Sequence, residues 1–261
     1  MQYGEAATCA QWIRSSRRVA VLSGAGLSTK AGIQDFRGPQ GLYRTLGISD
    51  PERIFDIDHF FRNPGFFFRF HREFLDLLDR VQPTGAHRFF ARLEEEGVLS
   101  GIVTQNIDGL HQKAGSRNVL EIHGGVRGNT CTGCGARYDL ATFRELLAAA
   151  EVPRCPRCGG IVKPDIVFFG EGVQALGACQ ALMEEADLLF VVGSSLVVTP
   201  AALLPSACPG RIVVVNKGEI SFSYLPRNRV SLHAEEDLDT FFQEVEEAYD
   251  TGEEEPPQTP V

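Results

Sequence analysis

Residues 19–29 read VAVLSGAGLST, a short apolar run that leads directly into a glycine-rich turn. Successive apolar residues before a turn are typical of a strand that a parallel sheet buries on both faces. The turn holds Gly24 and Gly26 but lacks the third glycine of the full dinucleotide-binding pattern, so its position directly after a strand matters. Backbone N–H groups at the start of a helix can bind a diphosphate. The stretch therefore predicts the first strand and the phosphate loop of a nucleotide-binding fold.

Three more apolar segments end in polar clusters. They are Ile102-Val103 before residues 104–108, Leu188–Val192 before residues 193–195, and Ile212–Val215 before Asn216. The carboxyl ends of parallel strands lie at one edge of a sheet, and ligands bind beyond that edge. The alternation of strands and helices therefore predicts an α/β fold with a doubly wound parallel, Rossmann-like sheet, whose polar clusters converge on one site.

Two segments are too long for ordinary connections between strands and helices. We expect them to pack together as a smaller inserted lobe with a zinc ribbon and a helical cofactor-loop module, leaving a cleft between the lobes. The tail is acidic and rich in proline, which predicts disorder. The predicted division is one domain over 1–250, with a Rossmann-like lobe over 1–30, 83–125 and 165–250, a small lobe over 31–82 and 126–164, and a disordered tail over 251–261.

Phenylalanines recur at helical spacing within the first of these segments. Asn63-Pro64 predicts a helix start, because Pro is favoured at the first helical position. Phe67, Phe70 and Phe74 then share one face, which is typical of a core or a pocket wall. His71, beside this stripe, is predicted to be a surface or capping histidine. Further helices are expected at about 5–16, 84–96, 140–150 and 236–249.

Four of the seven cysteines form two Cys-x-x-Cys pairs with 20 residues between them. The pairs are Cys131 with Cys134 and Cys155 with Cys158. Two such pairs can bind one zinc ion as a tetrahedral site, and four thiolates leave no open position, so the zinc is expected to be structural. A redox-active pair is the alternative, but neither pair opens a helix after a strand, as thioredoxin-like motifs do. The other three cysteines, at 9, 179 and 208, are interpreted as small apolar residues.

His123 ends an apolar segment that begins at Val119. It is expected at the same sheet edge as residues 105–108, where a neutral imidazole can act as a general base. A purely structural histidine is the alternative. Asp35 and Asp108 lack the spacing typical of a paired-carboxylate hydrolase.

The composition excludes several classes of function. The formal net charge of −9 argues against a general nucleic-acid binder, which needs a basic face, and suits a basic protein partner. No apolar run reaches the roughly 20 residues that span a bilayer, so no membrane partner is expected. Arg17-Arg18 before an apolar run resembles a twin-arginine export signal, but the run ends at Gly24 and is better explained as a strand. With the metal-spaced cysteines, this predicts a cytoplasmic protein.

Together, these segments resemble the sirtuin family of NAD-dependent protein-lysine deacylases, in its bacterial and archaeal form with a four-cysteine zinc site. The resemblance covers about residues 19–235 and follows the family's order. It rests on GAGLS at 24–28, GIQDFRG at 32–38, TQNIDGLH at 104–111, IHG at 122–124, the two cysteine pairs, KPDIVFFGE at 163–171, GSSL at 193–196 and Asn216.

The resemblance implies an enzyme that uses NAD to remove the acetyl group from lysine in proteins or peptides. It would transfer that group to ADP-ribose and release nicotinamide, free lysine and O-acetyl-ADP-ribose. The residues implied for catalysis are His123, as general base, with Asn106 and Asp108. Those implied for NAD are Gly24, Ala25, Gly26, Ser28, Thr29, Ile33, Asp35, Phe36, Arg37, Gln105, Asn106, Ile107, Asp108, Gly193, Ser194, Ser195, Asn216 and Lys217. Those implied to pair with the substrate backbone, by strand addition, are Ile166, Val167, Phe168 and Glu171. We expect a monomer.

Two positions bear on how this chain differs within the family. Gln34 replaces the family's proline, which restores a backbone donor and frees φ in the cofactor loop. Sirtuins that prefer succinyl- or malonyl-lysine carry a Tyr and an Arg three residues apart on a helix of the acyl tunnel. The matching positions here are His71 and Phe74, which cannot clamp a carboxylate, so neutral acyl groups are expected.

Other functions stay open on the sequence. A nicotinamide-dependent dehydrogenase would need a fuller glycine pattern and an acidic ribose partner, for which Asp50 is available. A non-catalytic zinc-ribbon interaction module is disfavoured by the net charge and by the intact Asn106, Asp108 and His123. Transfer of ADP-ribose to protein, or removal of longer acyl chains, would use the same site.

Overall fold

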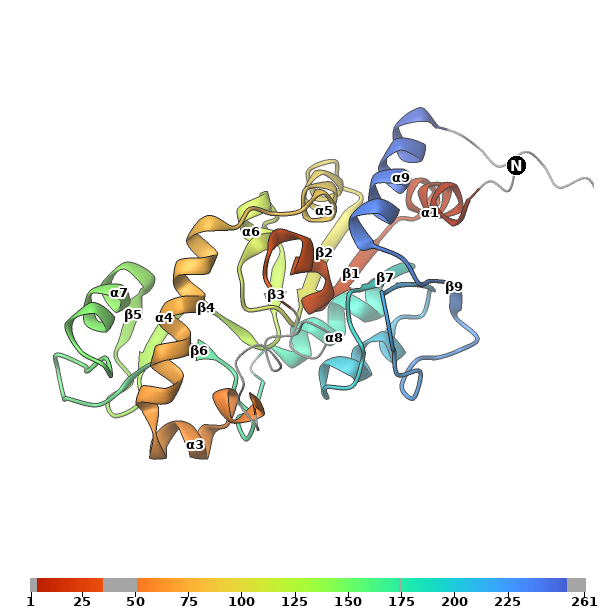
Figure 1. Cartoon of the computed structure of the whole chain (residues 1–261). Coiled ribbons are helices and arrows are strands. Elements are labelled where there is room, and N and C mark those ends of the chain that lie inside the picture. Colours follow the sequence, from red (N-terminus) through yellow and green to blue (C-terminus); the bar gives the residue numbers. More distant parts are fainter. Residues whose placement is uncertain (1–3, 35–50, 174, 253–261) are drawn as a thin grey trace, which may run out of the picture.

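Six parallel strands form the main sheet of the protein (Figure 1). The structure, a computed structural model, describes residues 4–34, 51–173 and 175–252. The strand order β3-β2-β1-β7-β8-β9 changes direction between β1 and β7, which is where doubly wound sheets bind ligands. The predicted doubly wound sheet is therefore confirmed. The strands are β1 Val19–Ser23, β2 Leu99–Thr104, β3 Val119–Glu121, β7 Leu188–Val192, β8 Arg211–Val215 and β9 Val230–Ala234.

The central strands are buried on both faces. In β1, Val19 and Val21 belong to one hydrophobic cluster, whereas Ala20 and Leu22 belong to another. Successive side chains of a strand point to opposite faces, so each helical layer takes every second residue. The first layer contains α1 (Glu5–Ser15), α5 (Gly85–Glu95) and α9 (Leu238–Thr251). The second contains α8 (Leu176–Glu185) and the 3₁₀ helix η3 (Ala201–Ala207).

A smaller lobe has its own antiparallel sheet of three strands, in the order β5-β4-β6. Its core is a third cluster rich in phenylalanine, in which the rings of Phe60, Phe67 and Phe168 contact one another with centroid separations of 5.0 to 5.6 Å. This cluster joins residues of both long segments. The predicted lobe boundaries stay a prediction, but Phe168 packs here and not against the main sheet. The elements are η2 Pro51–Phe55, α3 Ile57–Arg62, α4 Pro64–Arg80, β4 Gly124–Cys131, β5 Arg137–Asp139, α7 Leu140–Ala149 and β6 Val162–Ile166.

One local prediction is wrong. His71 does not lie at the surface: it is fully buried, and its ring stacks on Phe67 with centroids 5.1 Å apart. Residues four apart share one face of a helix, so the periodicity that buries Phe67 also buries His71. Helix α9 ends at Thr251, the first residue of the segment predicted as the tail. Residues 253–261 lie outside the described part of the chain.

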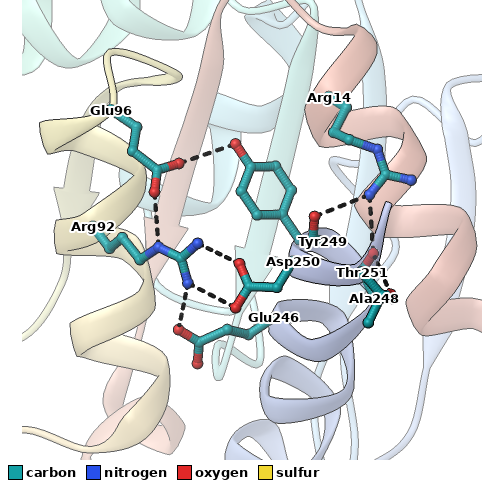
Figure 2. A network of polar contacts seen from close by, with 8 residues as sticks. All are labelled: Arg14, Arg92, Glu96, Glu246, Ala248, Tyr249, Asp250 and Thr251. Atoms are coloured by element: carbon teal, nitrogen blue, oxygen red, sulfur yellow. Dashed lines mark hydrogen bonds and ion pairs between the residues drawn. The ribbon is translucent and has the colours of Figure 1, made fainter. Parts of the chain in front are cut away.

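The C-terminal helix α9 is fastened by a polar network, shown in Figure 2. Arg92 of α5 contacts Glu96, which follows the last residue of α5, and it also contacts Glu246 and Asp250 of α9. On the other side, Arg14 of α1 donates hydrogen bonds to the last carbonyl groups of α9. The helix is thus held to α1 and α5 by charge as well as by its apolar face. Within the described residues, no helix has the length and apolar content needed to cross a membrane.

Candidate active site

The polar clusters that follow the main-sheet strands meet at one edge, as predicted. Hydrogen bonds connect them directly: Gln105 Nε2 donates to Ser194 Oγ at 2.8 Å, and Asn106 Nδ2 donates to Gly24 O at 3.1 Å. The Gly193 N–H donates to Val215 O, beside Asn216. Loops that are far apart in the sequence therefore form one surface at the point where the strand order changes direction.

Three glycines let the loops after β1 and β7 approach each other closely. A Cβ at Gly24 would lie 2.6 Å from Gly193 O, and one at Gly26 would lie 2.8 Å from Gly193 Cα. Gly193 itself has φ of 61°. The Gly24 and Gly26 N–H groups donate to Val192 O and Gly193 O, each at 2.9 Å. These two N–H groups join the loops and are not available to a diphosphate.

A cavity of about 160 Å³ lies beside this junction. For comparison, a cavity of about 150 Å³ accommodates benzene, so this one has room for one six-membered ring. Its polar side chains come mainly from the loops after β1 and β2, and its apolar wall comes from α4. The lining residues are Ala25, Ser28, Gly32, Ile33, Gln34, Phe74, Leu77, Asn106, Ile107 and Asp108. The sequence indicated the α4 stripe, which includes Phe74 and Leu77, as a core or pocket wall, but did not indicate Gly32 as part of this site.

Asp108 is the charged group of this lining. Its carboxylate accepts hydrogen bonds from Ser28 Oγ at 2.7 Å and from Leu110 N at 2.8 Å. Burial raises the pKa of Asp108, and these two hydrogen bonds oppose the rise. Each oxygen accepts one bond here and keeps a further lone pair, so the group can also accept a hydrogen bond from an amide in the cavity. Ser28 Oγ in turn accepts a bond from Asn106 Nδ2 at 3.2 Å.

His123 is held in one tautomer. Its Nδ1 lies 3.1 Å from the Gln105 carbonyl oxygen, which can only accept, so Nδ1 carries the proton. Burial lowers the pKa of His123, and this hydrogen bond opposes the shift. The ring is therefore neutral at pH 7, with Nε2 as its basic atom. That state suits a general base placed next to Asn106.

The segment predicted to pair with the substrate already makes many bonds within the protein. Val167 N donates to His123 O at 2.8 Å, and Phe168 N donates to Glu171 Oε2 at 2.8 Å. Lys163 Nζ donates to Ile166 O at 2.7 Å and contacts Glu171 at 2.9 Å. Ile166 and Phe168 are buried in the third cluster. Strand addition at this segment stays a prediction, and these bonds reduce the number of backbone groups it could use.

Of the other residues predicted for NAD, Ser195 is half-buried and its carbonyl oxygen accepts a hydrogen bond from Ser221 N at 2.8 Å, and the rest divide into three groups. Ser194 and Asn216 are buried, and Asn216 Nδ2 donates to Gly218 O at 3.1 Å, which shapes the loop after β8. Thr29 and Lys217 are exposed, and Thr29 Oγ1 donates to Gly26 O. Asp35, Phe36 and Arg37 lie outside the described residues.

The four metal-spaced cysteines converge in the small lobe. Their Sγ atoms all lie within 4.8 Å of one another, with 3.4 Å between Cys131 and Cys158 and 3.7 Å between Cys134 and Cys155. Zn–S bonds of about 2.3 Å in a tetrahedron place sulfur atoms about 3.8 Å apart, so the cluster fits one zinc ion. Cys9, Cys179 and Cys208 are fully buried, as expected for apolar residues.

Comparisons with known proteins agree on one family. A sequence model described as the Sir2 family matches residues 24–200. The NAD-dependent protein deacetylase of Thermotoga maritima is 42% identical over 215 residues, which cover 80% of this chain and 86% of that protein. NAD-dependent protein deacetylase 1 of Pyrobaculum aerophilum is 42% identical over 230 residues, covering 86% and 88%.

Solved structures give the same result. A Sir2 structure with a p53 peptide and NAD+ has a TM-score of 0.81 and 37% identity, covering 94% of this chain and 97% of that one. A structure of Sir2Tm bound to a propionylated peptide has a TM-score of 0.82 and 35% identity, covering 95% and 99%. The likeness thus extends over nearly the whole length of both chains.

Proposed function

The chain belongs to the Sir2 family, and from this premise we propose that it is an NAD-dependent protein-lysine deacetylase. The observation that carries the proposal is the cavity where the strand order changes direction, lined by Asn106 and Asp108, with the neutral imidazole of His123 held nearby. The many related proteins named as NAD-dependent protein deacetylases support it.

The residues of the cavity fit a nicotinamide group. The size of the cavity suits one ring. Apolar contacts come from Ala25, Ile33 and Ile107, and Asp108 can accept a hydrogen bond from a carboxamide. NAD, as co-substrate, supplies the ADP-ribose that accepts the acetyl group. Asn106 bonds to Gly24 O and Ser28 Oγ, which orients its amide at the inner end of the cavity. At its Nε2 atom, His123 would accept a proton from a ribose hydroxyl group of NAD.

The zinc site has a different role. Four thiolates fill a tetrahedral coordination shell and leave no position for a substrate. The cysteines lie on β4 and on the two turns that flank it and β6, so zinc would fasten the small antiparallel sheet. We assign the metal to folding and not to the chemistry.

The substrate class, the partners and the cellular location are part of the same proposal. The substrate is an acyl-lysine side chain of a protein or peptide, and acyl groups other than acetyl are part of the proposal only where they are neutral. The net charge of −9 disfavours nucleic acid as a partner. We propose a monomer that acts in the cytoplasm. Transfer of ADP-ribose to protein is a second candidate because it shares the release of nicotinamide.

Product analysis tests the proposal. The protein is incubated with NAD and an acetyl-lysine peptide, and the products are identified by mass spectrometry. We expect nicotinamide, deacetylated peptide and O-acetyl-ADP-ribose in equal amounts. ADP-ribosylated peptide would support the second candidate, and reduced cofactor would indicate a dehydrogenase.

A variant connects this activity to the site. His123→Ala should lower kcat by about 10²- to 10⁴-fold, the usual contribution of a general base. NAD affinity, measured by calorimetry, should change little because the cavity is intact. Near-normal turnover by the folded variant would contradict the role of His123.

A further inference from the structure

A buried chain of hydrogen bonds lies behind the cavity, at the ends of β1 and β2. Ser23 and Thr104 are the last residues of these strands and are paired in register. Ser23 Oγ donates to Thr104 Oγ1 at 2.8 Å, and Asn106 N donates to the same Thr104 Oγ1 at 3.1 Å. All three residues are buried. The Thr104 hydroxyl group therefore accepts one hydrogen bond from the neighbouring strand and one from the backbone of the active-site loop.

Asn106 needs this hydroxyl because the sheet ends before it. The last ladder bond between the two strands runs from Gln105 N to Ser23 O at 2.9 Å. Beyond that bond the chain leaves the sheet, and the direction of the next N–H group depends on a side chain. Thr104 supplies that acceptor two residues earlier in the chain, in a place without bulk water. A buried N–H without an acceptor would be costly.

One histidine extends the chain, and a second histidine packs against it. His111, on α6 (Leu110–Ala114), has its Nε2 2.8 Å from Ser23 Oγ. Since Ser23 gives its proton to Thr104, His111 donates from Nε2 and its Nδ1 is bare. His87 accepts from Thr84 N at Nδ1, so its own proton is on Nε2. The two ring centroids lie 4.7 Å apart, and within the described residues neither His111 Nδ1 nor His87 Nε2 has a hydrogen-bond partner.

We propose that Thr104, Ser23 and His111 are positioning residues that fix the backbone at Asn106 and thereby its amide group in the cavity. The inference rests on the proposed function. Because the Ser23 hydroxyl and the Asn106 N–H both donate to Thr104 Oγ1, removal of the Thr104 hydroxyl leaves the Asn106 N–H without its acceptor. Misplacement of a reacting group by about 1 Å can lower the rate by about 100-fold.

Two variants of Thr104 distinguish a role in positioning Asn106 from a role in the stability of the fold alone. Thr104→Val keeps the shape of the side chain and removes Oγ1, whereas Thr104→Ser keeps the hydroxyl and removes a methyl group. We expect Thr104→Val to lower kcat by about 10- to 100-fold while KM for the peptide changes by less than about threefold. Thr104→Ser should keep kcat within about threefold of the parent protein. A purely structural role would lower the melting temperature of both variants and leave kcat per folded molecule unchanged.

An NMR measurement tests the same inference without turnover. The Asn106 amide proton should resonate at the same position in the parent protein and in Thr104→Ser, and should move upfield in Thr104→Val. Ring ¹⁵N shifts should show His111 with its proton on Nε2. An unmoved Asn106 resonance and an unchanged kcat in Thr104→Val would overturn the inference. If the parent protein does not release nicotinamide, the proposed function fails. The Asn106 amide and His111 ring resonances then still show whether Thr104 fixes the Asn106 backbone.

Discussion

His71 is a polar residue held in an apolar place. Its ring lies between Phe67 and Phe143, and within the described structure neither ring nitrogen has a hydrogen-bond partner. Burial lowers its pKa to about 3, and the positive charges of Arg144 and Arg72 contribute to the shift. The residue therefore stays neutral in the folded protein over the whole physiological range.

This burial predicts a pH dependence of stability. Unfolding returns the imidazole to its ordinary pKa of 6.5, so between pH 6.5 and about 3 the unfolded chain binds a proton that the folded chain does not. Stability therefore falls as the pH falls through that window. In His71→Leu, the slope of unfolding free energy against pH should decrease by up to about 1.4 kcal/mol per pH unit. Urea unfolding at several pH values from about 4.5 to about 6.5, the upper part of that window, measures the slope; equal slopes in both proteins would contradict the prediction.

At the scale of elements, zinc should hold the antiparallel sheet of the small lobe together. Cys155→Ala removes one of four ligands, and metal affinity is coupled to folding, so the variant should lose its metal and melt at lower temperature. Hydrogen exchange of β4 and β6 should become faster than in the parent protein. Cys179→Ala is the control: it leaves a cavity in the main core and should keep its zinc. Elemental analysis that finds a full equivalent of zinc in Cys155→Ala would show that the ligand set is wrong.

The network around Arg92 predicts a salt-sensitive attachment of α9. Arg92 contacts three carboxylates, Glu96, Glu246 and Asp250, and is about one-third exposed. Single exposed ion pairs contribute little, but several charges around one guanidinium contribute more. Arg92→Met should lower the unfolding free energy by about 1 kcal/mol in dilute buffer, and less in 1 M salt, where the Debye length is about 3 Å.

Arg69 provides the matched control for this prediction. It forms a single pair with Glu151, and both side chains are more than 60% exposed. Arg69→Met should therefore leave stability unchanged in either buffer. A loss in Arg92→Met that is equal at both salt concentrations would mean that packing of its stem, and not charge, attaches the helix.

At the scale of the whole molecule, the cavity walls come from both lobes, and we expect the α4 wall to bear on the acyl preference. Phe74 of α4 lines the cavity, whereas His71 is buried away from it, and the charged side chain of the lining is the acidic Asp108. A succinyl carboxylate beside the α4 wall would meet no cation from Phe74 or Leu77. Burial of an unpaired carboxylate costs several kcal/mol, and each 1.4 kcal/mol is tenfold.

We therefore expect kcat/KM for an acetyl peptide to exceed that for the matched succinyl peptide by about 100-fold or more. Phe74→Arg would place a cation in the wall and should narrow this ratio. Equal values for the two peptides in the parent protein would show that the acyl group lies elsewhere or meets a cation outside the lining.

The sequence by itself determined the features that depend on neighbours in the chain. The central strands β1, β7 and β8 are buried on both faces, so they appear as continuous apolar runs, and their polar ends indicate the site. The cysteine spacing determined the metal ligands, because three residues are enough to bring two thiolates onto one ion. The edge strand β9 was not predicted from the sequence. Its first four residues alternate between half-buried and exposed, so it has no apolar run.

The tertiary structure alone decided the features that depend on contacts between distant segments. Gly24 and Gly26 look like phosphate-loop glycines, yet they are required because Gly193, far along the chain, lies against them. The acceptor for Asn106 N is a hydroxyl that Ser23 of another strand orients. Whether His71 or Phe74 faces the cavity depends on how α4 packs against Phe143 and Phe168. Helical spacing defines the face that a residue shares, and only packing decides what that face contacts.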